Sequence, residues 1–234
     1  MSEQAFVLPV WDTINTAWTK VSGTKKTFWA AIGILAAIMF GIGLLEGITE
    51  KAWAISGFLQ IIGNVLGYFL QLGLVYIGIT RAKDMPINYK MLFATFDLQI
   101  ALRLVGLYIL QTLIFLIPVI IGALGIMLYM TDNIAMQGFG VILIIASGIC
   151  TIIIAVRLSI SIAYVLDADE APLAAIKKSL AATNGNVWHL IGIYLLQLLI
   201  LGISVIPAGI GLIWSLPFLL ICYGMIYKQL RVNT

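Results

Sequence analysis

Residues 104–114 read LVGLYILQTLI, and residues 190–200 read LIGIYLLQLLI. Seven of the eleven positions are identical. Leucine and isoleucine matches carry little information in a chain that is 62% hydrophobic, so the informative matches are the glycine, the tyrosine and the glutamine (Gly106 with Gly192, Tyr108 with Tyr194, Gln111 with Gln197). At the same offset, Pro86 aligns with Pro172. The match predicts duplicated units, in each of which a short segment that begins near a proline leads into an apolar span.

The composition is that of an integral membrane protein. Mean hydropathy is +1.10 and only 10% of the residues are charged, whereas a soluble domain carries about 25% to keep its surface hydrated. A helix needs about 20 apolar residues to cross the hydrocarbon core. Runs of this kind predict an all-α protein with six transmembrane helices, near residues 28–45, 54–79, 101–129, 138–165, 187–206 and 208–227. The last two runs are separated only by residues 207–209, so a single re-entrant hairpin is the alternative there.

Basic residues predict the orientation of these spans. They fall on alternate connections, while the other connections carry Glu46, Glu50, Lys51 and Asp132. Because positively charged loops stay in the cytoplasm, both termini are expected there. The net charge of +3 then reflects topology and not nucleic-acid binding. The basic side consists of Lys20, Lys25, Lys26, Arg81, Lys83, Lys90, Lys177, Lys178, Lys228 and Arg231.

Each cytoplasmic segment that precedes an odd-numbered span has the pattern of an amphipathic interfacial helix. In the third segment, Leu173, Ile176 and Leu180 form an apolar stripe, and Lys177 and Lys178 point away from it. Such helices lie among lipid headgroups with their lysines toward anionic lipid. The chain is therefore expected to be one polytopic domain of three parallel repeats, each an interfacial helix and a transmembrane hairpin, at approximately 8–80, 85–166 and 171–231.

The stretch 157–188, RLSISIAYVLDADEAPLAAIKKSLAATNGNVW, carries a family resemblance. It resembles a bacterial six-span inner-membrane family that includes the membrane domain attached to some glycerophosphodiester phosphodiesterases, and related uncharacterised inner-membrane proteins. The matching elements are Arg157, the acidic turn at 167–170, and then Ala175, Ser179, Thr183, Gly185, Asn186 and Trp188. The resemblance implies a bacterial inner-membrane location. In that family the phosphodiesterase is a separate soluble domain for which this chain has no room, so that activity is not implied here.

The chemistry of these residues also predicts their structural roles without the family resemblance. Ser179, Thr183 and Asn186 are spaced to hydrogen-bond the backbone where the chain turns into the fifth span. Gly185 permits the turn, and Trp188 is expected to lie at headgroup level.

Arg157 is the most unusual polar residue, because it precedes the acidic turn by about ten positions, or roughly 15 Å of straight helix. Intramembrane arginines are costly and tend to face a partner, a cavity or a headgroup. One interpretation is a site for a lipid phosphate or a substrate carboxylate. The other is structural: Arg157 reaches the cytoplasmic interface, or pairs with Asp97 or Asp167.

Four further polar residues lie within predicted spans, namely Gln71, Gln111, Gln197 and Asn64. At the offset of the duplication, Gln71 corresponds to Arg157. Gln111 and Gln197 share one depth and are expected first to bond each other or neighbouring carbonyls, and only second to bind a ligand. Together with Arg157, the four residues form the candidate lipid- or substrate-binding set.

The sequence offers little for catalysis. Its single histidine, His189, stands at the start of the fifth span, and the acids Asp167, Asp169 and Glu170 also fit an ordinary helix start. No metal-ligand spacing or nucleophile motif is present, so we expect no enzyme, no cofactor and no metal. The favoured hypothesis is a non-enzymatic inner-membrane protein that binds or organises lipid, or scaffolds an envelope or transport complex with a protein partner. The alternative is a transporter or lipid-translocating protein with a polar track around Arg157.

Overall fold

The computed structural model describes residues 6–49, 52–206 and 209–232. Within these residues the chain is helical and contains no strand. The elements in order are α1 (Val10–Lys20), α2 (Lys25–Thr49), α3 (Trp53–Ala82), the 3-10 helix η1 (Tyr89–Phe96), α4 (Leu98–Tyr129), α5 (Ile134–Leu158), α6 (Ser161–Ala168), α7 (Pro172–Ala182), α8 (Val187–Val205) and α9 (Leu212–Val232). Six helical segments, with α5 and α6 taken as one, are long and apolar enough to cross a membrane.

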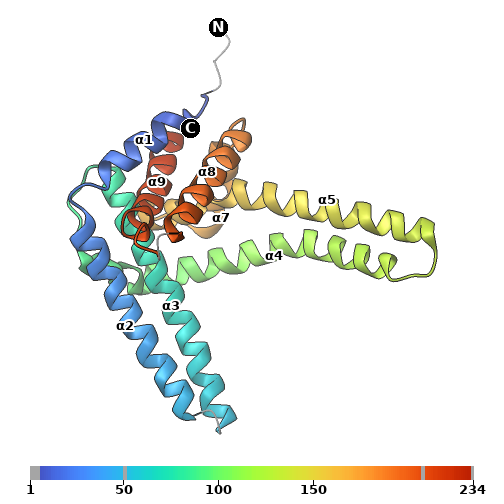
Figure 1. The fold of residues 1–234 in the computed structure, drawn as a ribbon, viewed down its shortest axis with the longest axis horizontal. Helices are drawn as coiled ribbons and strands as arrows, with labels where there is room; N and C mark the ends of the chain where they lie inside the picture. Colours follow the sequence, from blue (N-terminus) through green and yellow to red (C-terminus); the bar gives the residue numbers. More distant parts are fainter. Residues whose placement is uncertain (1–5, 50–51, 207–208, 233–234) are drawn as a thin grey trace.

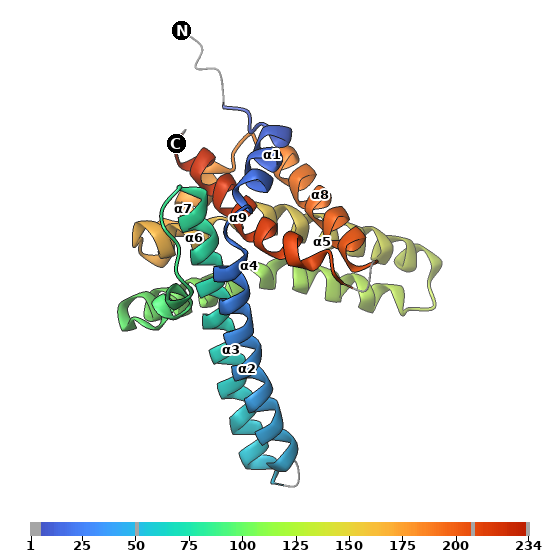
Figure 2. The ribbon, with the colours of Figure 1, turned by 60° about the vertical axis from the view of Figure 1, so that its left-hand side comes forward.

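The long helices form three hairpins, and a short helix precedes each of them. We call α2–α3 the first arm, α4–α5 the second arm and α8–α9 the third hairpin. Figures 1 and 2 show that the two arms diverge from one end of the molecule. We call this end the base. It consists of α1, η1, α6 and α7 together with the adjoining ends of the long helices.

Side-chain caps fix where the second arm begins and turns. Asp97 Oδ1 accepts from the backbone nitrogens of Gln99 (3.0 Å) and Ile100 (3.3 Å) at the start of α4. Asn133 Oδ1 does the same for Ala135 at the start of α5 (2.9 Å). These acceptors satisfy N–H groups that have no partner within the helix.

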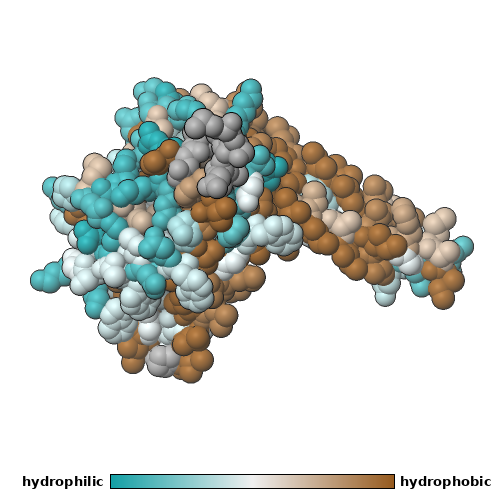
Figure 3. All heavy atoms as spheres, turned by 90° about the horizontal axis from the view of Figure 1, so that it is seen from above, coloured by the Kyte–Doolittle hydropathy of each residue, from teal (hydrophilic) through white to brown (hydrophobic). Residues whose placement is uncertain are grey.

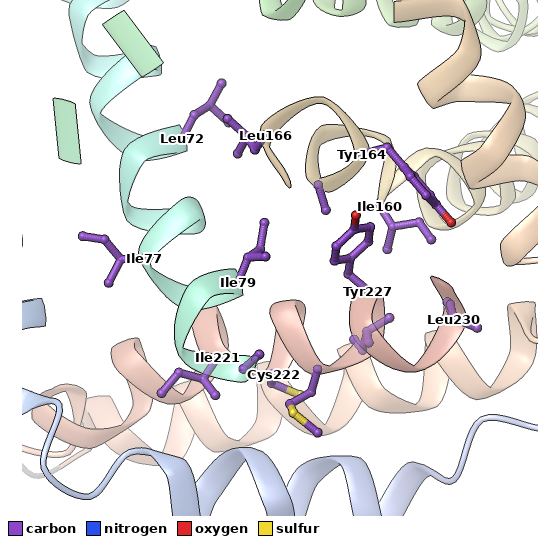
Figure 4. Close-up of a cluster of buried hydrophobic side chains, with 14 of the residues drawn as sticks. Leu72, Ile77, Ile79, Ile160, Tyr164, Leu166, Ile221, Cys222, Tyr227 and Leu230 are labelled. Carbon is purple, nitrogen blue, oxygen red and sulfur yellow. The ribbon is translucent and has the colours of Figure 1, made fainter. Parts of the chain in front are cut away.

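Helix α9 is the core helix of the base. Half of its apolar window is buried, compared with 11–33% in the other five spans. It crosses α3 at small residues, where a methyl group on Gly224 would lie 2.8 Å from the carbonyl oxygen of Gly78. Figure 4 shows the cluster that results, with Ile79 of α3 near Ile221 and Tyr227 of α9, and Ile160 of the segment between α5 and α6 beside them.

The start of α9 in the third hairpin lies against the start of the first arm. The residues that follow its connection contact the beginning of α2: Trp29 Nε1 donates to the Ile213 carbonyl (3.2 Å), and Lys25 Nζ lies 4.6 Å from the centroid of the Trp214 ring. The crossing of α9 with α3 near the base accounts for this placement. The start of α9 thus lies beside the start of α2, a contact that agrees with the re-entrant alternative.

The fourth predicted span is not one straight helix. It consists of α5 and α6, and the chain bends at residues 159 and 160 between them. The carbonyls freed at this break accept hydrogen bonds from hydroxyl groups: Ser159 Oγ donates to Val156 O (2.7 Å) and Ser161 Oγ to Leu158 O (2.6 Å). A break inside an apolar span is tolerated where such groups replace the lost backbone bonds.

Candidate functional site

The charged residues are distributed unequally along the molecule. Over the described residues, twelve lysines and arginines lie at the base against six carboxylates, whereas the far ends of the two arms carry Glu46 and Asp132. Figure 3 shows hydrophilic residues gathered over the base and a hydrophobic surface along the second arm. The twelve are Lys20, Lys25, Lys26, Arg81, Lys83, Lys90, Arg103, Arg157, Lys177, Lys178, Lys228 and Arg231.

A buried carboxylate joins the ends of three helices within the base. Asp167, whose side chain is 8% exposed, accepts from Lys83 Nζ (2.6 Å) and from Arg231 Nη1 (2.5 Å). Tyr227 Oη also donates to it (3.0 Å). Lys83 follows α3, Asp167 belongs to α6, and the other two residues belong to α9. The interaction therefore holds together the base ends of the first arm, the second arm and the third hairpin.

Two hollows flank this cluster and share Arg231. One, of about 380 Å³, is lined by three cations and one carboxylate (Lys83, Asp167, Tyr227, Lys228, Arg231 and Val232). The other, of about 360 Å³, is lined by Tyr164, Ala168, Glu170, Lys178, Ala181 and Arg231. The first hollow has more positive than negative charge, which favours an anionic group such as a phosphate.

A second ion pair lies at the rim of the base. Lys20 Nζ bonds Asp84, and Lys228 Nζ lies 3.5 Å from the same carboxylate. The Lys20 hydrogen bond holds the pKa of Asp84 below its ordinary value of 3.8. Asp84 has a positive φ of 62°, so this turn places the carboxylate between α1 and α9.

Arg157 lies at the base end of α5 and contacts α7. Its Nη2 donates to the Leu180 carbonyl (3.0 Å), and its own carbonyl accepts from Ser179 Oγ (2.6 Å) and Thr183 Oγ1 (3.4 Å). Its Nε is buried without a partner among the described residues. The expectation that Arg157 pairs with Asp97 or Asp167 is wrong, because Asp97 caps α4 and the Asp167 carboxylate pairs with Lys83 and Arg231.

Three other helices bond to the break that follows Arg157. Tyr194 Oη of α8 donates to Ser159 Oγ (2.8 Å), and Tyr223 Oη of α9 donates to the Ser159 carbonyl (2.8 Å). Gln111 of α4 donates to Ser161 Oγ (2.8 Å). Sequence reasoning did not find this network, because a serine pair in an apolar run gives no sign that the helix breaks there.

The four remaining polar candidates lie in different places. Gln111 and Gln197 do not bond each other: Gln111 bonds Ser161, and Gln197 interacts with the Cys222 thiol while its Nε2 is buried without a partner among the described residues. Gln71 is exposed on α3, and Asn64 lines a hollow between α3 and α4. Together with Arg157, these residues contact separate neighbours and do not form one polar track.

The motif residues of α7 and the following turn make long-range contacts as well as local ones. Thr183 Oγ1 bonds the Ser179 carbonyl (2.8 Å), and Gly185 has the positive φ of 76° that the turn requires. Asn186, expected to bond its own turn, instead bonds the N-terminal segment through Phe6 O (2.9 Å) and Leu8 N (2.7 Å). Lys177, Lys178 and Trp188 are exposed. This turn therefore fixes the N-terminal segment to the base.

The three acids and the histidine do not converge. Lys178 pairs with Glu170 and Arg103 with Asp169, while Asp167 belongs to the cluster described above. His189 Nδ1 is buried without a partner in the part of the chain that the structure describes. No group of three or more potential metal ligands occurs within that part.

Sequence reasoning recognised Lys83 and Arg231 only as loop charges, and it considered Asp167 as part of the acidic turn and as a partner for Arg157. The sequence could have predicted that these three side chains lie on the same side of the membrane, since each follows the end of an even-numbered predicted span on the side assigned to the cytoplasm. The sequence did not indicate which pairs would form. Comparison with models of protein families, with curated proteins and with solved structures finds no match. The family resemblance of residues 157–188 therefore stays a prediction.

Proposed function

We propose that this chain is a non-enzymatic, multi-pass protein of the bacterial inner membrane that binds and organises anionic phospholipid at the cytoplasmic surface. The observation that carries the proposal is the segregation of charge, with twelve cations against six carboxylates at the base of apolar arms. Basic segments next to a membrane attract anionic lipid by about 1 kcal/mol per lysine or arginine near the surface. The hollow lined by Lys83, Lys228 and Arg231 offers a place where such an attraction becomes a bound headgroup.

The proposal includes an orientation. The base faces the cytoplasm, which places both termini there, and the apolar arms enter the bilayer. The three units 8–80, 85–166 and 171–231 are parallel repeats of one interfacial helix and one hairpin. Support comes from the order of elements, in which α1, η1 and α7 each precede a hairpin.

Two related functions draw on the same features. A scaffold for an envelope complex would use the exposed charges of α7, Lys177 and Lys178, to bind a protein partner. A lipid-translocating protein would need a polar track, for which the separate contacts of Arg157, Gln111 and Gln197 give less support. The resemblance to the membrane domains of glycerophosphodiester phosphodiesterases agrees with any of the three.

The proposal is tested by the lipid that stays with the protein. Wild-type protein and the variant K83Q/K228Q/R231Q are incorporated into nanodiscs of mixed anionic and zwitterionic lipid and released, and bound lipids are identified by native mass spectrometry. We expect fewer bound anionic lipids for the variant and no change for the control E46Q, which alters a charge at the far end of the first arm. Equal anionic lipid in wild type and variant contradicts the proposal.

A further inference from the structure

Three of the candidate membrane spans end at the two hollows that flank Asp167. Lys83 directly follows the first of these spans, and Asp167 and Arg231 are each the next-to-last residue of another. A helix that crosses the hydrocarbon core ends at the level of the lipid headgroups. If the base lies at the membrane surface, as the proposed function holds, both hollows lie at the level of the lipid phosphates. The three spans are Trp53–Ala82, Ile134–Ala168 and Leu212–Val232.

The two hollows adjoin each other. We call the hollow of about 380 Å³ the Lys83 hollow and the one of about 360 Å³ the Lys178 hollow. Tyr227 of the Lys83 hollow packs edge to face against Tyr164 of the Lys178 hollow, with ring centroids 5.1 Å apart (Figure 4). Arg231 borders both hollows. A ligand that has two anionic groups on a short linker can therefore place one group in each hollow.

The two hollows together have a surplus of positive charge. Over the residues that the structure describes, four cations line them against two carboxylates, which leaves two positive charges in excess. The additional carboxylate near Lys228, that of Asp84, also pairs with Lys20, so this pair leaves the surplus unchanged. A phosphodiester carries one negative charge, and two phosphodiesters therefore match the surplus. The four cations are Lys83, Lys178, Lys228 and Arg231, and the two carboxylates are those of Asp167 and Glu170.

Each hollow also keeps hydrogen-bond donors for phosphate oxygens. The Asp167 carboxylate offers little repulsion, because it is 8% exposed and both of its oxygens accept hydrogen bonds. Among the described residues, Lys83 Nζ bonds only Asp167 and Lys178 Nζ bonds only Glu170. A lysine has three N–H donors, so each of these two lysines has donors left for a ligand.

We propose that the paired hollows bind one phospholipid in which a glycerol joins two phosphate groups, with one phosphate in each hollow. Lys83 and Lys228 donate to the first phosphate, Lys178 donates to the second, and Arg231 lies between them. The inference rests on the proposed function and names the class of anionic lipid that the base prefers. Because the two phosphates are linked, the second contact is intramolecular, and such a lipid binds more tightly than two separate monophosphate lipids.

The experiment compares lipids at an equal number of phosphates. Wild-type protein in mild detergent is incubated with the two-phosphate lipid or with twice its concentration of phosphatidylglycerol, and the retained lipid is counted by native mass spectrometry. Both samples then contain the same number of acyl chains per phosphate. We expect the two-phosphate lipid to be retained at least about tenfold more strongly, and equal retention overturns the proposal.

Two neighbouring lysines of α7 provide the matched variants. K178Q removes a cation from the Lys178 hollow and should lower the ratio of two-phosphate to monophosphate lipid by about fivefold, the contribution of one cation near anionic lipid. Lys177 is also exposed but lines neither hollow, so K177Q should weaken the retention of both lipids alike and leave their ratio unchanged. Equal ratios in K178Q and K177Q overturn the proposal, because the preference then comes from general surface charge or from the acyl chains.

A soluble ligand is the other source of two linked phosphates. Inorganic pyrophosphate at the concentration of the lipid should not displace it, and displacement overturns the assignment to a lipid. The inference and the proposed function fail in distinguishable ways. Enrichment of anionic over zwitterionic lipid without a preference for two linked phosphates removes the inference and leaves the proposed function, whereas no enrichment of either anionic lipid removes both.

Discussion

Replacing Asp167 with asparagine removes the charge that joins three helix ends while keeping the size of the side chain. The carboxylate is 8% exposed and binds Lys83, Arg231 and Tyr227. Removing one partner of a fully buried pair costs about 3–5 kcal/mol, since the other charge stays buried and unpaired. Here Lys83 and Arg231 are 32% and 45% exposed, so both reach water and the cost is smaller. We therefore expect a loss of about 2–3 kcal/mol.

The assay is thermal unfolding of the purified protein in detergent, followed by tryptophan fluorescence. For a chain of this length each kcal/mol corresponds to about 2–4 °C, so D167N should lower Tm by roughly 5–10 °C. The control D132N changes an exposed acid at the far end of the second arm and should alter the free energy of unfolding by less than about 0.5 kcal/mol.

A double-mutant cycle separates the ion pair from general disruption. If Asp167 and Lys83 interact as the structure shows, D167N combined with K83M should be less destabilising than the sum of the two single changes. A Tm for D167N equal to that of D132N, or additive effects in the cycle, would refute the reasoning.

Three further predictions concern packing, pH and topology. G73A should destabilise the protein by about 1–3 kcal/mol or more, because the new methyl group would lie 2.0 Å from a backbone oxygen of η1. The control G57A places its methyl group where no atom lies within 4 Å and should be neutral or slightly stabilising. Chemical denaturation measures the stability of both variants, and equal stability contradicts the prediction. Because the Lys20 hydrogen bond lowers the pKa of Asp84, the contribution of the ionised Asp84 to stability is fully present above pH 3.8 and is lost as the pH falls through the lowered pKa. The Tm advantage of wild type over D84N should therefore shrink in acid. A difference in Tm that stays constant with pH contradicts the assignment. In sealed vesicles, I210C should be labelled from the cytoplasmic side if the contact of the third hairpin with the start of α2 marks a re-entrant hairpin, and labelling only from the outer side shows a full crossing.

The helical class was predictable from the sequence because it follows from the length and apolarity of the runs, which leave the backbone no partner but itself in lipid. Six candidate spans were predicted and six are found. The turn at Gly185 was also predictable, since its positive φ favours glycine. These features depend on residues close together in the sequence.

Features that depend on distant contacts were not predictable. The partners of Arg157 and Asn186 lie across the base, at Leu180 and at Phe6, and no local pattern selects them. The segment that the sequence predicts as the second interfacial helix is the 3-10 helix η1 and not an α-helix, and Gly73 of α3 approaches its backbone closely. The break after Leu158 likewise depends on hydroxyls supplied by other helices.

The central claim is that the charged base recruits anionic phospholipid. It is tested most directly by the ratio of anionic to zwitterionic phospholipid retained by the wild-type protein from an equimolar membrane, measured by native mass spectrometry at two salt concentrations. The account predicts a ratio above one that falls as salt screens the exposed charges of the base. A ratio of one at both salt concentrations would contradict it.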